Sequence, residues 1–120
     1  MNLPQDLTIF EKILRGDIPC TPVYEDEHTL AFKDLHPQAP VHVLVILKQK
    51  KFVNVSDAES KEDANLLGHL LFAAKKVAEK MDIAKSGYRL IINNGADAHQ
   101  TVAYLHCHVL GGRKFGWPPG

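Results

Sequence analysis

Apolar residues recur at helical spacing in two segments of the chain. The first begins after Thr8, and Glu11 stands three residues later, which is the spacing of a capping box. Four residues form its apolar face: Ile9, Phe10, Ile13 and Leu14. Gly16 then provides a stop signal. The second segment runs from about Ser60 to Met81, with its Lys and Glu residues mostly opposite the apolar face. The pattern therefore predicts a short helix and a long helix.

Five other segments carry the apolar pattern of β-strands. Their expected bounds are 22–26, 29–34, 41–47, 87–93 and 102–110. Segment 41–47 is apolar or β-branched at nearly every position, which predicts a central strand buried on both faces. Strands joined by short turns pair antiparallel, and we expect the helices to cover one face of the sheet. The fold class is then an α+β sandwich, whose other face must be covered by a loop, a ligand or a second copy of the chain.

Length and charge limit the class of protein. The 120 residues suit a single domain over residues 8–120, after a flexible leader at residues 1–7. Basic and acidic residues number 14 each, so the chain lacks the basic excess of a nucleic-acid binder. Neither a signal peptide nor an apolar run of about 20 residues for a membrane span is seen. The separated Cys20 and Cys107 fit a reducing compartment, and we expect a cytoplasmic protein.

The last predicted strand carries two histidines on one side. Side chains alternate along a strand, so Tyr104, His106 and His108 point one way. Leu105, Cys107 and Val109 point the other way, into the helix-covered core. Two imidazoles packed together in a core would each need a polar partner, so this pair suits a site better than a packing element.

Three uses of this pair remain open on residue types alone. Imidazole is neutral and nucleophilic near pH 7, so His106 is suited to attack phosphorus through a covalent intermediate. The Gln100 amide, the Thr101 hydroxyl and nearby backbone N–H groups are candidate donors to the phosphoryl oxygens. A metal site on His106 and His108 is the second use, and zinc would need a third ligand such as His42 or His99. A purely structural pair is the third.

Several segments together resemble one known family. Residues 104–110 resemble the histidine-triad motif, His-φ-His-φ-His-φ-φ, in which φ is apolar. Residues 9–19 resemble the first helix of the histidine triad (HIT) family, residues 31–42 its nucleoside-binding strand and Pro-rich loop, and residues 87–95 its fourth strand. The end, residues 111–120, is similar to the Hint branch. The resemblance covers nearly the whole chain from Thr8 onward.

The resemblance implies a function and a set of site residues. The family forms homodimers whose strands join into one ten-stranded sheet, and it hydrolyses purine nucleoside 5′-phosphoramidates without a metal or organic cofactor. Motif matching makes His106 the nucleophile, places His108 on the phosphate and gives Asp34 the ribose hydroxyls. The base slot would be lined by Phe10, Ile13, Phe32 and Leu35. The phosphate would be surrounded by Asn93, the His99 backbone, Gln100 and Thr101, with Trp117 of the neighbouring subunit near the leaving group.

Two departures from the family pattern raise a second hypothesis. Tyr104 occupies the first triad position, where a tyrosine hydroxyl can still donate a hydrogen bond. In residues 47–52 the family has Pro and then a fourth histidine, whereas this chain has Lys50 and Lys51 and one extra residue. A nucleotide sensor or adaptor with weak or no turnover is therefore the alternative to an enzyme. Simpler interpretations stand beside these: Asp34 as a turn cap, and His42 as a satisfied buried histidine.

Overall fold

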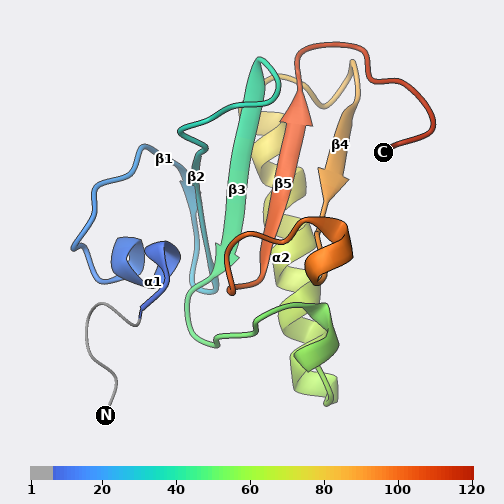
Figure 1. The fold of residues 1–120 in the computed structure, drawn as a ribbon. Helices are drawn as coiled ribbons and strands as arrows, with labels where there is room; N and C mark the ends of the chain where they lie inside the picture. Colours follow the sequence, from blue (N-terminus) through green and yellow to red (C-terminus); the bar gives the residue numbers. More distant parts are fainter. Residues whose placement is uncertain (1–6) are drawn as a thin grey trace.

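A five-stranded antiparallel sheet forms the centre of the computed structural model, which describes residues 7–120 (Figure 1). The strands are β1 (Pro22–Glu25), β2 (Thr29–Lys33), β3 (Val41–Leu47), β4 (Tyr88–Ile91) and β5 (His106–Gly111). They lie in the order β1-β2-β3-β5-β4, and every neighbouring pair is antiparallel. The predicted α+β fold class with an antiparallel sheet is confirmed. Most of the expected leader, residues 1–6, lies outside the described residues.

Strand β3 lies between β2 and β5 and is buried on both faces, as its continuous apolar pattern predicted. Val43 and Val45 point into one core cluster, whereas Leu44 and Ile46 point into another on the opposite face. This alternation follows from the two-residue period of a strand. A strand that is apolar at every position except His42 therefore links two separate hydrophobic cores.

The two helices begin at capping boxes. In α1 (Ile9–Leu14), the Thr8 hydroxyl accepts from the Glu11 backbone at 3.2 Å, and the Glu11 carboxylate accepts from the Thr8 backbone at 3.0 Å, as predicted. Helix α2 (Lys61–Lys80) has the same arrangement between Ser60 and Asp63. Within residues 7–120, neither helix is long and apolar enough to cross a membrane.

The helices lie on opposite faces of the sheet, so the expectation that both cover one face was wrong (Figure 1). Helix α2 covers one face through a cluster that includes Leu70, Ala74 and Val77, with Cys107 and Val109 of β5 packed against it. On the other face, α1 contributes Phe10 to a smaller cluster with Leu30, Phe32, Leu44, Ile46 and Tyr104. A six-residue helix that buries only Phe10 cannot cover a whole sheet face, and part of this face stays open.

The last strand begins later than predicted. Residues 102–105 do not pair in the sheet, and β5 starts at His106, opposite Ile46 of β3. Because His106 pairs with Ile46, the register would place Leu105 beside Leu47, where β3 ends, and the residues before Leu105 have no β3 residue beside them. They are held instead by single hydrogen bonds, including Leu105 N–H to the Phe52 carbonyl at 2.7 Å. The other predicted strand and helix ends agree within two residues.

The lysine cluster after β3 is used for ion pairing within the chain. Each of its three members contacts a different carboxylate: Lys48–Glu25 at 2.8 Å, Lys50–Asp63 at 2.6 Å and Lys51–Glu11 at 3.3 Å. The carboxylates belong to β1, α2 and α1, so the loop after β3 is tied to three elements. The three lysine side chains are thus 30–51% exposed and each is paired.

Candidate active site

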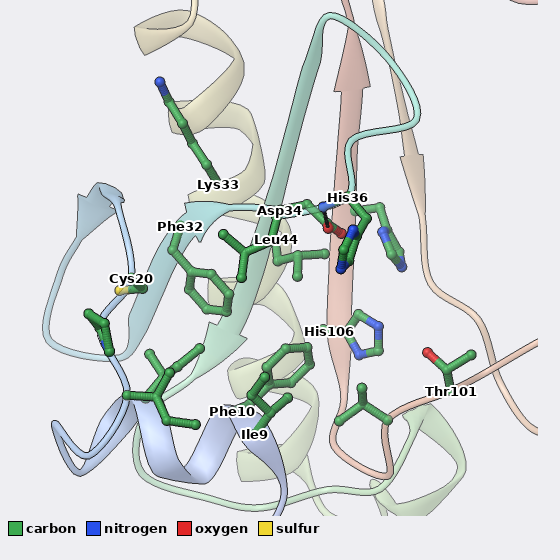
Figure 2. A pocket seen from close by; sticks show the side chains of 16 residues that line it. Ile9, Phe10, Cys20, Phe32, Lys33, Asp34, His36, Leu44, Thr101 and His106 are labelled. Carbon is green, nitrogen blue, oxygen red and sulfur yellow. Dashed lines mark hydrogen bonds between the residues drawn. The ribbon is translucent and has the colours of Figure 1, made fainter.

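A pocket of about 270 Å³ opens on the α1 face of the sheet (Figure 2). Its wall is mainly apolar and includes Ile9, Phe10, Ile13, Ile18, Pro19, Cys20, Phe32, Leu35, Leu44 and Val102. Most of the polar groups lie toward one end of it, namely Asp34, His36, Thr101, His106 and His108, whereas Lys33 lies apart from them. An apolar slot with a few convergent polar groups is the usual form of a small-molecule site.

Most of the residues predicted for the base slot, ribose and phosphate line this pocket. They are Phe10, Ile13, Phe32, Asp34, Leu35, Thr101, His106 and His108. Phe10 and Phe32 contact each other edge to face, with ring centroids 5.7 Å apart. Both rings also belong to a buried core cluster, so the same two side chains stabilise the fold and form part of the pocket wall. Leu35, at 78% exposure, stands at the rim.

Asn93, His99 and Gln100 are not among the residues that line the pocket. The Gln100 amide is occupied within its own loop: it donates to the Val53 carbonyl at 2.6 Å and accepts from Gly95 N–H at 2.9 Å. The His99 backbone N–H is also used, in a bond to the Ala96 carbonyl at 3.0 Å. In this state these groups hold the loop in shape, while Thr101 alone of that loop's predicted donors reaches the pocket wall.

Trp117 lies on the C-terminal segment and is 82% exposed. The segment is anchored by Phe115, whose ring lies 5.1 Å from the Arg89 guanidinium and 4.2 Å from that of Arg113. Arg89 also donates to the Gly116 carbonyl at 2.8 Å. The segment is thus fixed at its base while its tryptophan faces outward. The predicted place of Trp117 near a neighbouring subunit's leaving group stays a prediction.

The tautomer of His106 follows from its hydrogen bond. Its Nδ1 lies 2.7 Å from the Tyr104 carbonyl oxygen, which can only accept, so Nδ1 carries the proton. The other nitrogen, Nε2, is therefore unprotonated and has a free lone pair. His106 is 6% exposed and its ring packs at 4.9 Å against Phe10, which fixes the ring plane. A fixed, neutral imidazole with a free Nε2 has the properties of a nucleophile.

The tautomer of His108 is set by a chain of two hydrogen bonds. The Gln38 backbone N–H donates to His42 Nδ1 at 3.0 Å, so the proton of neutral His42 is on Nε2. That Nε2–H lies 2.8 Å from His108 Nδ1, which must accept it. His108 therefore carries its proton on Nε2 and is a donor there. The two triad histidines therefore differ at Nε2: this atom is a hydrogen-bond acceptor in His106 and a hydrogen-bond donor in His108.

Burial keeps these histidines neutral at pH 7. Desolvation lowers the pKa of His106, although its bond to the Tyr104 carbonyl and the charge of Asp34 act in the opposite direction. Desolvation, with the neighbouring His106 and His42, lowers the pKa of His108 to about 4. The pKa of His42 is lowered by burial and raised in part by Asp34. The site thus holds three neutral imidazoles beside one carboxylate.

Asp34 has both a structural and a site position. Its Oδ1 accepts from the His36 backbone N–H at 2.8 Å, which is the turn-capping role that aspartate often has. Its Oδ2 lies 3.4 Å from His42 Nε2, and Asp34 is one of the residues that line the pocket (Figure 2). The carboxylate therefore stabilises the His42 tautomer and still offers lone pairs to a bound hydroxyl group.

Asp34, His42 and His108 also lie close enough together to be considered as metal ligands. A metal bound to His42 Nε2 requires the proton to be on Nδ1, but Nδ1 accepts a hydrogen bond from the Gln38 N–H. His42 Nε2 and His108 Nδ1 are moreover bonded to each other at 2.8 Å rather than directed to a common point. This donor set of Asp34, His42 and His108 does not fit a metal ion.

His42 is the site residue whose role was underestimated from the sequence. It is buried and hydrogen-bonded, as the simpler interpretation held, but its partner is a triad histidine. The signal was its alternation with Leu44 and Ile46 on β3, since this places it on the pocket face. The Tyr104 hydroxyl does donate a hydrogen bond, but to the Leu47 carbonyl at 2.7 Å and not into the pocket.

Comparisons with known proteins agree with this geometry. A model of the HIT domain matches residues 15–115. An uncharacterized HIT-like protein of Synechocystis is 57% identical over 113 residues, which are 94% of this chain and 96% of that protein. A 14 kDa zinc-binding protein of Zea mays is 47% identical over 119 residues, 99% of this chain and 92% of that protein.

The fold is shared as well as the sequence. The structure of a HIT family hydrolase from Legionella pneumophila matches with a TM-score of 0.88 and 43% identity, covering 95% of this chain and 100% of that one. Such a neighbour, together with a neutral histidine whose Nε2 is free beside an apolar pocket, supports a hydrolase. The family model spans most of the sequence and includes both triad histidines, and this chain belongs to the HIT domain family.

Proposed function

We propose that this protein hydrolyses purine nucleoside 5′-phosphoramidates, of the adenosine monophosphoramidate type, to a nucleoside monophosphate and an amine. One observation carries the proposal: His106 and His108 are neutral and have opposite tautomers at the polar end of an apolar slot. One supplies a lone pair for phosphorus, and the other supplies an N–H for a phosphoryl oxygen. Both are needed for displacement at a charged phosphoryl group.

The reaction divides into two displacements. His106 Nε2 attacks the α-phosphorus, a bond from phosphorus to Nε2 forms, and the bond to the substrate nitrogen breaks as the departing amine takes up a proton from water, which leaves a hydroxide ion. His108 Nε2–H donates to an oxygen of the phosphoryl group, where negative charge collects. A second water then attacks the phosphorus of the nucleotidyl-histidine and gives its proton to the hydroxide. The bond to Nε2 breaks, and the nucleoside monophosphate leaves with His106 neutral again.

The slot supports a flat, largely apolar base and a ribose. Phe10, Ile13 and Phe32 provide the wall for the base, and Leu35 lies at its rim. Asp34 lines the same pocket as this wall and the two histidines, so a ribose that joins its base to its 5′-phosphate could reach the carboxylate. A carboxylate accepts from two adjacent hydroxyl groups, and thus favours a ribonucleotide.

A homodimer belongs to the same proposal. Strand β4 is at the edge of the sheet, and its backbone is available for pairing with a second copy to give a continuous ten-stranded sheet. Leu90 on that strand is 36% exposed and Trp117 is 82% exposed, so both have apolar surface for a partner to cover. In the dimer, Trp117 of one copy would lie near the leaving group bound to the other.

A nucleotide sensor with little turnover is the second candidate, and it is favoured by the absence of histidine at position 104. Zinc binding, which the name of the Zea mays relative states for that protein, is less well supported here because of the His42 tautomer. Trapping of a covalent nucleotide adduct on His106 distinguishes an enzyme from a sensor. An enzyme of the proposed type forms an adduct on His106 that decays, whereas a sensor binds nucleotide without one.

The test uses adenosine phosphoramidate labelled with ³²P and quenched within milliseconds. We expect an acid-labile label on the wild-type protein that is absent from His106→Ala, and we expect His106→Ala to retain the wild-type circular dichroism spectrum. His28→Ala is the matched control, because that histidine stacks on His69 at 3.9 Å, away from the pocket. Wild-type turnover by His106→Ala would refute the assignment, and loss of turnover in EDTA would favour a metal enzyme.

A further inference from the structure

Tyr104 is held deep in the α1-side core by its hydroxyl group. The side chain is 3% exposed, and the hydroxyl donates to the carbonyl of Leu47, the last residue of β3, at 2.7 Å. Burial, with the charge of Glu11, raises the pKa of Tyr104 to about 12, so the hydroxyl remains a donor at any working pH. This hydrogen bond joins two segments that are 57 residues apart in sequence.

The same residue contacts the nucleophile by two routes. Its carbonyl oxygen accepts the Nδ1–H of His106 at 2.7 Å, which fixes the tautomer. Its ring meets the Phe10 ring edge to face at 6.1 Å and 89°, and Phe10 in turn meets the His106 ring at 4.9 Å and 72°. Edge-to-face contacts have preferred geometry, so each ring restricts the next.

The backbone at this point has little other support. Residues 102–105 are not in a strand, and β5 begins only at His106. The Leu105 N–H bond to the Phe52 carbonyl and the Tyr104 hydroxyl bond are the long-range hydrogen bonds that hold this stretch in the part of the chain that the structure describes. The position of the carbonyl that orients His106 therefore depends on how the Tyr104 side chain is anchored.

We propose that Tyr104 is a positioning residue, whose hydroxyl bond to the Leu47 carbonyl and ring contact with Phe10 hold the nucleophile His106 in the orientation that attack requires. This inference rests on the proposed hydrolase function. Tyr104 contributes no atom to the pocket, so it acts through His106 and Phe10. The tyrosine at the first triad position is then compatible with an active site, because its hydrogen bond to Leu47 fixes the backbone that orients His106.

The experiment compares Tyr104→Phe with Tyr24→Phe. Tyr24 is a matched control, because its hydroxyl also makes a side-chain hydrogen bond, to Asp26 at 2.9 Å, on a strand that does not reach the pocket. For Tyr104→Phe we expect kcat on adenosine phosphoramidate to fall about fivefold, the worth of one hydrogen bond, with KM changed less than about twofold. Tyr104→Leu, which also removes the aromatic edge, should lower kcat by a further factor of about five.

A second measurement reads His106 directly and needs no turnover. Long-range ¹H–¹⁵N spectra of the histidine rings report the tautomer and titration of His106, assigned by comparison with His106→Ala. We expect Tyr104→Phe to shift and broaden the His106 ring signals and Tyr24→Phe to leave them unchanged. Unchanged His106 signals in Tyr104→Phe would overturn the proposal, even if the variant were less stable. If no variant hydrolysed the substrate, the proposed function would fail while the ring spectra still decided the role of Tyr104.

Discussion

The two faces of the sheet are built from the same strands but are closed to different degrees. On the α2 face, Cys107 and Val109 of β5 pack under a 20-residue helix in a continuous aliphatic core. On the α1 face, His106 and His108 of the same strand meet a six-residue helix and a pocket. A single alternating strand therefore supplies one closed core and one reactive surface.

The difference shows how the fold prepares the histidines. The incomplete cover on the α1 face leaves room for a ligand, but its aromatic cluster still removes enough water to keep the imidazoles neutral. The closed face meanwhile fixes β3 and β5, because their other side chains are fully buried there. The α2 face makes the strands rigid and the α1 face holds the pocket, so mutations on the α2 face should change stability and mutations on the α1 face should change ligand binding.

The largest effect is expected from breaking the closed face. Leu70 is a residue of α2 that is fully buried in the cluster between this helix and the sheet, so Leu70→Ala should lower the free energy of unfolding by about 3 kcal/mol through lost burial and a cavity. Urea unfolding measures this loss. The dissociation constant for AMP, measured below the unfolding transition, should stay within about twofold of wild type. A large loss of affinity without loss of stability would contradict the division between the faces.

The matching change on the open face is Leu44→Ala. Leu44 lies opposite His108 in the register of β3 with β5 and forms part of the pocket wall. We expect a smaller loss of stability, about 2 kcal/mol, because the pocket already leaves this side partly unpacked. Affinity for AMP should fall about tenfold, since the slot loses apolar contact area. Calorimetric titration measures the affinity, and an unchanged value would show that the base binds elsewhere.

The closed face was easier to predict from the sequence than the open one. Continuous apolar residues at 41–47 and helical spacing at 60–81 are strong local patterns, and they correctly predicted β3 and α2. Residues 102–105 also carry a strand pattern, but whether they pair depends on where β3 ends. That end belongs to another part of the sequence, so the local pattern of residues 102–105 cannot predict the pairing. The bond from His42 to His108 spans 66 residues, and no local pattern specifies the tautomer that it imposes.

The role of His42 provides the next test, because it distinguishes an ordered histidine chain from mere proximity. His42→Phe keeps an aromatic ring but removes the donor to His108 Nδ1, so His108 no longer has a fixed tautomer. We expect kcat to fall about 10- to 100-fold, the usual cost of losing a group that orients a catalytic histidine. His28→Phe is the control. Equal activity of the two variants would show that His108 needs no orienting partner.

A fall in pH should reduce stability through the histidines of the α1 face before it affects the aliphatic core of the α2 face. The pKa of His108 is lowered to about 4, below its unfolded value of about 6.5, so the unfolded chain takes up the proton first. Stability from this residue is complete above pH 6.5 and is lost as the pH falls toward 4. We expect the free energy of unfolding to drop by about 2 kcal/mol between pH 7 and pH 5, and His108→Gln to flatten this slope. Equal slopes in urea titrations of the two proteins would rule out His108 as the cause.

The smallest effect is expected at a link between the two faces. Lys50, on the loop after β3, contacts Asp63 in the first turn of α2 at 2.6 Å, and hydrogen bonds lower the pKa of that carboxyl to about 2. Because the lysine is half-exposed, Lys50→Ala should cost no more than about 1 kcal/mol. Lys75→Ala, which breaks an exposed pair within α2, is the control. Asp63 also caps α2 through Glu59 and Ser60, so Asp63→Ala should cost more than Lys50→Ala, and the reverse order would show that the loop tether outweighs the cap.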